Sequence, residues 1–288
     1  MTQLNKLFHF CCVLFVTILP LQNLFAEDTR FQEPGIRQEI STIITAKQHP
    51  YLKQVNFTNR SEDLDALYKL SNYNLLWLGN SQSAKNTADA LDLLASASAH
   101  GLVKENYDVD LLRAKYSSVL TLAPEAYKDL ALYDTALSLS VLRYLHDMHY
   151  GRVNPQGINY KLQLREKKLI ELPTLIKDSL NLNTLSQLPL LVEPKLKQYQ
   201  KLKSALAAYR LIAEKSTSFT FVHKGKLRPG QEHPQLAELS QYLANVGDLP
   251  ESAVINEKKP TYIYSPELVD AVKKFQLRHG VGADGTIG

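Results

Sequence analysis

Apolar side chains recur every three to four residues along much of the chain, which is the spacing of amphipathic helices. The clearest stripe consists of Leu130, Tyr133, Leu137, Val141, Tyr144 and Met148. Further leucines widen its apolar face, so we expect this helix to be central and to stop at Gly151. Similar spacing predicts helices near residues 61–70, 86–100 and 193–215, and shorter helices between 157 and 191. The pattern predicts a mainly α fold.

Capping residues indicate where these helices begin. Ser61 precedes the first stripe, either Asn86 or Thr87 precedes the second, and Pro124 suits the first turn of the central helix. Gly101 is expected to end the second helix, because glycine accepts the left-handed conformation that follows many helices.

A different pattern begins near residue 216. Phe219 and Phe221 alternate with polar residues, as in a short strand. Two helices follow, near residues 236–246 and 266–279, with strand-like residues 262–264 between them and Ser265 as the cap of the second. The change predicts a helical domain over 27–215, then a linker and a small domain over 216–288. Two amphipathic helices need a third element to cover them, so we expect an incomplete three-helix domain, truncated at its C-terminus.

The N-terminus has the layout of a secretory signal peptide. Lys6 is the only charged residue before an apolar stretch that ends at Phe25, and Ala26 stands before the acidic Glu27. We expect a signal peptide over residues 1–26 and an exported chain with no stable membrane span after cleavage. A retained anchor is the alternative, but the apolar run is short for a span of roughly 20 residues.

Composition excludes several classes of site. Cys11 and Cys12 are the only cysteines and lie in the signal, so the exported chain has no thiol for a disulfide, a metal or catalysis. The formal net charge is +4, and the basic residues are too scattered for a nucleic-acid surface. Phosphate-binding loops and EF-hand patterns are missing from the sequence, and we expect no cofactor.

The last stretch, VKKFQLRHGVGADGTIG (272–288), resembles the signature of the small helical peptidoglycan-binding domain. The phenylalanine–glutamine pair, the glycine and the DG-x-IG run stand at the spacings of that family. GDLP (247–250) and the LAELSQYL helix (236–243) before it also fit.

The longer stretch resembles the scaffold domain of large periplasmic L,D-transpeptidases. The pieces that carry the resemblance are LYKLSNYNLLWL (67–78), ALDLLASASAHGL (90–102), LRYLHDMHYGRVNP (142–155) and YRLIAEKS (209–216), followed by KGKLRPG (224–230). Together with the binding domain, the resemblance covers nearly all of residues 27–288.

The resemblance implies a periplasmic, wall-associated protein whose partner is peptidoglycan, with other wall-synthesis proteins as further partners. Relatives continue into a YkuD-type domain, where a cysteine attacks a stem peptide and passes the acyl group to a neighbouring stem, giving a 3-3 cross-link. Without that cysteine, this chain is expected not to catalyse the transfer. It is interpreted as the non-catalytic front of such an enzyme. A stand-alone exported scaffold that recruits a wall enzyme, and a wall hydrolase acting through carboxylates, remain as alternatives.

Several conspicuous residues have structural explanations. His146 and His149 stand three apart, not at the four-residue spacing of zinc helices, and are interpreted as the polar end of the central helix rather than a metal site. Gly151 and Arg152 fit a helix stop with the arginine paired to an acid or a carbonyl. Trp77, the only tryptophan, is expected in the core.

The candidate peptidoglycan-binding residues are polar positions in the last stretch, where a shallow groove for glycan or stem peptide is predicted: Gln276, Arg278, His279 and Asp284. Asp284 has the alternative role of bracing its own turn. Phe275 is expected in the core of the small domain, and Gly280 and Gly285 at a helix end and a turn.

Overall fold

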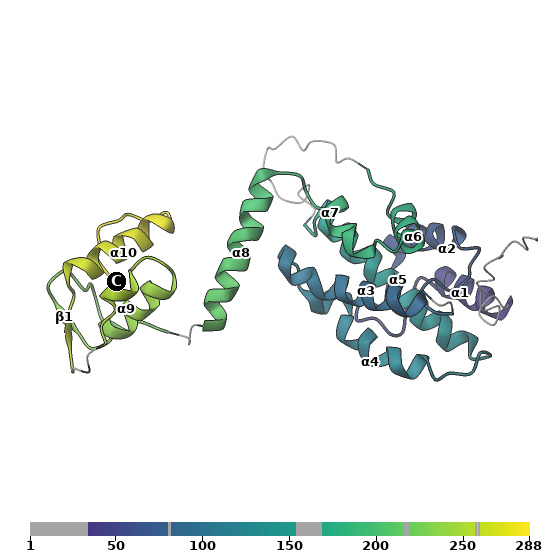
Figure 1. Cartoon of the computed structure of the whole chain (residues 1–288), viewed down its shortest axis with the longest axis horizontal. Coiled ribbons are helices and arrows are strands. Elements are labelled where there is room, and N and C mark those ends of the chain that lie inside the picture. Colours follow the sequence, from purple (N-terminus) through teal and green to yellow (C-terminus); the bar gives the residue numbers. More distant parts are fainter. Residues whose placement is uncertain (1–33, 80–81, 154–168, 216–218, 257, 259) are drawn as a thin grey trace, which may run out of the picture.

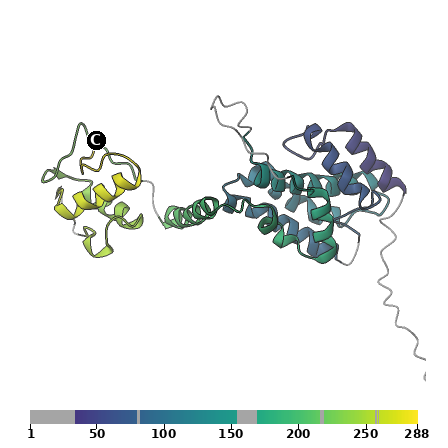
Figure 2. The same ribbon diagram turned by 90° about the horizontal axis from the view of Figure 1, so that it is seen from above.

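The computed structural model describes residues 34–79, 82–153, 169–215, 219–256, 258 and 260–288. Figures 1 and 2 show two helical bodies with a long helix, α8 (Lys197–Lys215), between them. Buried apolar side chains form two separate clusters, one drawn from residues 36–192 and one from residues 227–272. The predicted mainly α fold is confirmed. The predicted signal peptide lies outside the described residues.

The first body is an assembly of helices around α5 (Tyr127–Tyr150), which contacts all the others (Figure 1). They are α1 (Pro34–Ala46), α2 (Ser61–Lys69), α3 (Ser83–Ala95), α4 (Val109–Val119), α6 (Leu172–Leu182) and α7 (Leu188–Val192). Helix α5 is central because its predicted stripe is buried, as are the residues on its other faces. The shorter helices expected between 157 and 191 are present in the described part of that region.

Polar residues on α5 are buried as completely as its leucines. Asp134, Thr135, Ser138 and Ser140 have no exposed surface. The apolar stripe does not predict this, because a polar residue between apolar ones is normally assigned to the solvent face. A buried polar group requires a hydrogen-bond partner, so these residues point to contacts with other segments.

Asp134 is the centre of a buried hydrogen-bond network. Its Oδ1 accepts from the Leu76 amide at 2.9 Å and the Tyr68 hydroxyl at 2.7 Å, and its Oδ2 accepts from the Trp77 amide at 2.8 Å. The Trp77 indole donates to Ser138 Oγ at 2.8 Å. Two of these bonds satisfy the amides of Leu76 and Trp77 in the segment 75–78, which is buried without belonging to a helix. Burial raises the pKa of Asp134 to about 6, although hydrogen bonds from these three donors and from the Leu78 amide act to lower the pKa.

Three predicted helix starts are wrong. Ser61 is the first helical residue rather than the cap, and its hydroxyl donates to the Thr58 carbonyl at 2.9 Å. Helix α3 begins at Ser83, so Asn86 and Thr87 lie inside it, where Thr87 Oγ1 donates to the Trp77 carbonyl at 2.7 Å. Helix α5 begins at Tyr127, after Pro124. Thr87 thus bonds to a segment ten residues away, which the capping pattern at the helix start does not reveal.

Helix α8 begins at Lys197 rather than near Glu193, because Glu193 is extended and Pro194 follows it. The Glu193 carboxylate accepts from Lys203 at 2.8 Å. The predicted apolar stripe of this helix does not form a core, since Leu196 and Leu202 are more than 60% exposed.

The second body contains α9 (Leu236–Asn245), α10 (Pro266–Arg278) and an antiparallel pair of two-residue strands, β1 (Glu232–His233) and β2 (Tyr262–Ile263). Ser265 caps α10 as predicted, accepting from the Leu268 amide at 3.4 Å. The strand predicted at Phe219 and Phe221 is wrong. Both rings instead pack on the second cluster.

Within the described residues, none of the helices has the length and apolar character needed to cross a membrane.

The first prediction concerns Asp134. Replacement by Asn keeps the shape but turns an amide N–H₂ toward backbone donors, so we expect a loss of about 3 kcal/mol in the free energy of unfolding. Urea unfolding followed by the fluorescence of Trp77 measures it. Asp178→Asn, an exposed position on α6, is the matched control. Equal stability of the two variants would contradict the role of Asp134.

The second prediction concerns His49, which has no exposed surface. Its Nε2 lies 3.0 Å from the Leu132 carbonyl, and its Nδ1 accepts from the Tyr51 amide at 3.3 Å, so the ring is held neutral. Burial lowers the pKa of His49 to about 4. The unfolded chain, with a His pKa near 6.5, therefore binds more protons between these values.

The contribution of His49 to the free energy of unfolding, roughly 3 kcal/mol, is thus fully present above about pH 6.5. It is lost as the pH falls toward 4. Asp134 has the opposite sign, because its raised pKa makes stability fall as pH rises from about 4 to 6. We expect His49→Gln to flatten the acid limb of the stability–pH curve. His223→Gln, an exposed control, leaves the curve unchanged. An unaltered acid limb in His49→Gln would refute the assignment.

Candidate functional site

The second body carries a groove of about 420 Å³ between α9, α10 and the C-terminal residues. Its lining is mostly aromatic and aliphatic, and consists of Phe219, Phe221, Leu239, Tyr242, Leu243, Val272, Phe275, Gln276, Val281, Thr286, Ile287 and Gly288. A concave apolar surface with a few polar groups is the usual form of a ligand site.

Three aromatic rings form the wall of this groove. The centroids of Phe219 and Tyr242 are 5.8 Å apart, and those of Tyr242 and Phe275 are 6.2 Å apart. Phe275 is partly buried against the second cluster, as expected of a core residue, yet it also lines the groove. Such a wall offers apolar ring faces to a ligand.

Gln276 braces the C-terminal loop from α10. Its Nε2 donates to Asp284 Oδ1 at 3.2 Å and the Thr286 carbonyl at 3.0 Å, and its Oε1 accepts from the Gly285 amide at 2.9 Å. Asp284 Oδ1 also accepts from the Thr286 amide at 2.8 Å, and this bond lowers the pKa of Asp284. Asp284 therefore braces its own turn, the alternative role named for it above.

Gly285 is required at this turn for two reasons. Its φ is +73°, and a Cβ there would lie 2.8 Å from Val269 Cγ1. Its carbonyl accepts from the buried Tyr264 hydroxyl at 2.7 Å. Ile287 then pairs with Leu227 through two backbone hydrogen bonds. The loop that forms one side of the groove is therefore fixed at several points.

Arg278 and His279 lie at the end of α10, outside the lining of the groove. Arg278 forms an ion pair with Asp248, its Nε lying 3.4 Å from Asp248 Oδ1, and its guanidinium carbon is 5.8 Å from the centre of the Tyr209 ring on α8. The His279 ring packs on Phe275 at 4.1 Å between centroids. Gly280, with φ +70°, follows this helix end as predicted.

Of the four predicted binding residues, only Gln276 lines the groove. The aromatic wall was not identified from the sequence, because Phe219 stands outside the stretches that fit the family and Tyr242 lies in one of them without being singled out. One feature of the sequence could have indicated Tyr242 as a lining residue. It directly precedes Leu243, which belongs to the buried apolar face of α9.

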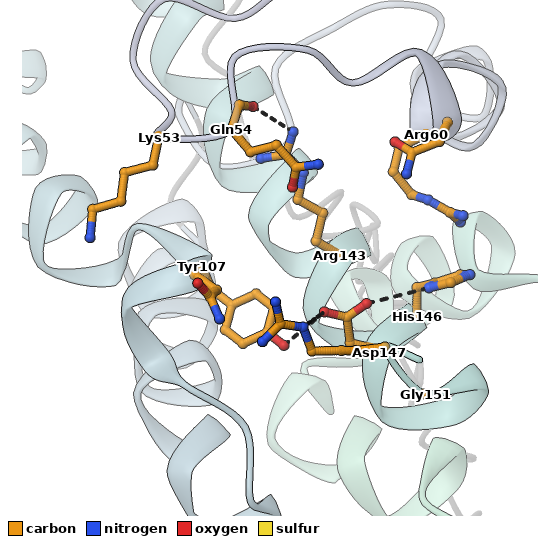
Figure 3. A pocket seen from close by; sticks show the side chains of 11 residues that line it. Lys53, Gln54, Arg60, Tyr107, Arg143, His146, Asp147 and Gly151 are labelled. Carbon is orange, nitrogen blue, oxygen red and sulfur yellow. Dashed lines mark hydrogen bonds and ion pairs between the residues drawn. The ribbon is translucent and has the colours of Figure 1, made fainter. Parts of the chain in front are cut away.

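The first body carries a smaller, polar pocket of about 300 Å³ near the C-terminal end of α5 (Figure 3). It is lined by Lys53, Gln54, Asn59, Arg60, Asn106, Tyr107, Arg143, His146, Asp147, Gly151 and Arg152. Gly151, with φ +79°, ends α5, and Arg152 Nε lies 3.6 Å from Asp147 Oδ2. Gly151 therefore stands at the end of the helix, and Arg152 lies beside an acid.

Asp147 interacts with several of the polar side chains that line this pocket. It accepts from the Tyr107 hydroxyl at 3.0 Å, and its Oδ1 is 3.6 Å from His146 Nδ1 (Figure 3). His149 instead contacts the Val192 carbonyl at 2.8 Å. Across the described ranges, no group of three or more His, Cys, Asp or Glu residues is placed to hold a metal ion. Trp77 is fully buried, as predicted.

Comparison with protein families identifies two matches. Residues 62–206, half of the chain, match the Scaffold domain. Residues 232–288 match the Putative peptidoglycan binding domain, and all the residues that line the groove except Phe219 and Phe221 lie in this matched region. A search of curated proteins finds no match.

The third prediction concerns the brace on the loop. Gln276→Ala removes three hydrogen bonds, so we expect amide exchange at Gly285 and Thr286 to accelerate by about tenfold or more. Hydrogen exchange followed by NMR measures it. Gln241→Ala on α9, whose side chain bonds only to its neighbour Asn245 at 3.1 Å, serves as the control. Unchanged protection at Gly285 in Gln276→Ala would show that the loop is held by other contacts.

Proposed function

The chain belongs to the Scaffold domain family, and on that premise we propose that it positions peptidoglycan for L,D-transpeptidation by a catalytic domain that is not among its 288 residues. The match of residues 232–288 to a peptidoglycan-binding domain is the observation that carries this proposal. In this proposal the protein works in the periplasm, to which residues 1–26 direct it.

The chemistry supports a holding role rather than acyl transfer. A transpeptidase of this kind needs a thiolate nucleophile, and residues 27–288 contain no cysteine. The contribution of these residues is binding, which raises the local concentration of the wall strand at a tethered catalytic centre.

The groove is the proposed contact for the wall. Its aromatic wall supplies apolar faces for sugar rings or alanine methyl groups, and Gln276 and Thr286 supply polar groups beside it. Arg278 and His279 flank the groove at the end of α10, where they can meet the more polar parts of a stem peptide. Other wall-synthesis proteins are further proposed partners.

The fourth prediction is that the full chain co-sediments with insoluble sacculi and that Val281→Ser weakens binding about fivefold. Val281 is 56% exposed and lines the groove, so its removal deletes apolar contact with the ligand without disturbing the core. Leu277→Ser is the matched control, because Leu277 is also exposed, on α10, but is not part of the lining.

Three results would contradict the proposal. One is a folded chain, verified by circular dichroism, that stays in the supernatant. Another is equal loss of binding in Val281→Ser and Leu277→Ser, which would place the contact elsewhere. Release of soluble wall fragments would favour a hydrolase instead.

A further inference from the structure

Arg143 is a buried cation with an incomplete set of partners. It is 6% exposed and rises from α5 toward the loop that carries Gln54 (Figure 3). Its Nη2 donates to the Gln54 carbonyl at 2.8 Å and to the Asn56 carbonyl at 3.4 Å. Its Nε and Nη1 have no hydrogen-bond partner in the described structure. Arginine stays protonated, so a full charge and three N–H groups are left without acceptors.

Acids near Arg143 do not neutralise it by direct contact. Asp108 and Asp147 act on its pKa through space, but neither forms an ion pair with it among the described residues. Asp147 is engaged by Tyr107 and Arg152. A buried charge without a close counter-charge is costly, so such a residue is retained where a ligand supplies the missing acceptors.

The surrounding pocket has an excess of positive charge. Besides Arg143, its lining includes the cations Lys53, Arg60 and Arg152, against the single carboxylate of Asp147. Arg60 is also held by Asp63 at 2.7 Å, outside the lining. A concave surface with this balance concentrates anions.

We propose that this pocket binds a small oxyanion, a carboxylate or phosphate group, through the free N–H donors of Arg143. Its free Nε–H and Nη1–H groups lie on different edges of the planar guanidinium, so each offers a single charge-assisted hydrogen bond to an oxygen of such a group. A volume of about 300 Å³ accommodates the anionic end of a peptide or a phosphate. Arg152 and Lys53 at the rim add charge but no further anchoring. This binding does not depend on the wall-binding function of the second body.

A ligand can reach the free N–H groups of Arg143 only after a small local change in the structure. Nε and Nη1 each have less than 1 Å² of exposed surface. Gln54 is exposed and lines the pocket with Arg143 (Figure 3), and in this proposal a change of its rotamer opens the path to the guanidinium. The competing explanation is an internal water molecule on the same donors, which would leave the charge uncompensated and would give no saturable anion binding.

The fifth prediction is tested by titrating the full chain with inorganic phosphate and with N-acetyl-D-alanyl-D-alanine, followed by NMR of the backbone amides and the arginine Nε–H groups. We expect saturable shifts at Gln54, Arg143 and Arg152. Saturation by the dipeptide alone identifies a peptide carboxylate as the ligand group, and saturation by phosphate alone identifies a phosphate. Both results support the pocket, whereas linear shifts with both probes overturn it.

A matched pair of variants decides the location. Arg152→Gln and Arg113→Gln remove the same charge from side chains that are each 48% exposed and each paired with one aspartate, but only Arg152 lines the pocket. We expect Arg152→Gln to weaken binding about threefold and Arg113→Gln to leave it unchanged. Equal affinities in the two variants overturn the proposal.

Arg143→Lys keeps the charge but loses the fixed planar N–H donors, and we expect it to weaken binding more than tenfold. Thermal unfolding checks that this variant is folded. If it is not folded, the comparison of Arg152→Gln with Arg113→Gln still decides the question. A folded Arg143→Lys with wild-type affinity would overturn the role of Arg143.

Discussion

The carboxylate of Asp134 is the interaction on which the first body depends. It lies in the first half of α5 and accepts from the amides of Leu76 and Trp77, in the segment 75–78 that passes through the core without the hydrogen bonds of a helix. Buried backbone groups must be paired, so this segment is stable only where a side chain supplies acceptors. The same segment places Trp77 against Ser138, and Thr87 on α3 binds the Trp77 carbonyl. One carboxylate thus connects α2, α3 and α5.

Helix α5 has different roles along its length. Its middle is buried on every side and holds the fold together, whereas its last turns carry Arg143, Asp147 and the stop at Gly151 around the polar pocket. A rigid, fully packed helix is a suitable base for a binding site because it fixes the positions of its side chains. The stability of the first body and the proposed anion site therefore both depend on α5. The two proposed ligand sites lie in different bodies.

The second body uses other means to fix its site. The loop at residues 284–287 is irregular, and its shape is set by Gln276, by the Tyr264 hydroxyl and by backbone pairing with Leu227. Two of the four polar residues that stood out in the sequence, Gln276 and Asp284, are used in this bracing. The surface left for a ligand is the aromatic wall beside them, so recognition and support are divided between two sets of side chains.

The sequence by itself determined the mainly helical fold, the central helix, the cap at Ser265 and the peptidoglycan-binding signature. Each of these is recorded in local spacing, because helical periodicity and capping depend on residues within a few positions of one another. Reliance on local spacing also explains the errors at Thr87 and Phe219, whose partners are set by the packing of the fold. Only the tertiary structure decided that Asp134 and Arg143 are buried and which groups face them. Asp134 is 57 and 58 residues from the amides it accepts, and Arg143 is 89 residues from the Gln54 carbonyl. Burial of a charge depends on what the rest of the chain packs around it, and no pattern on a single helix specifies that.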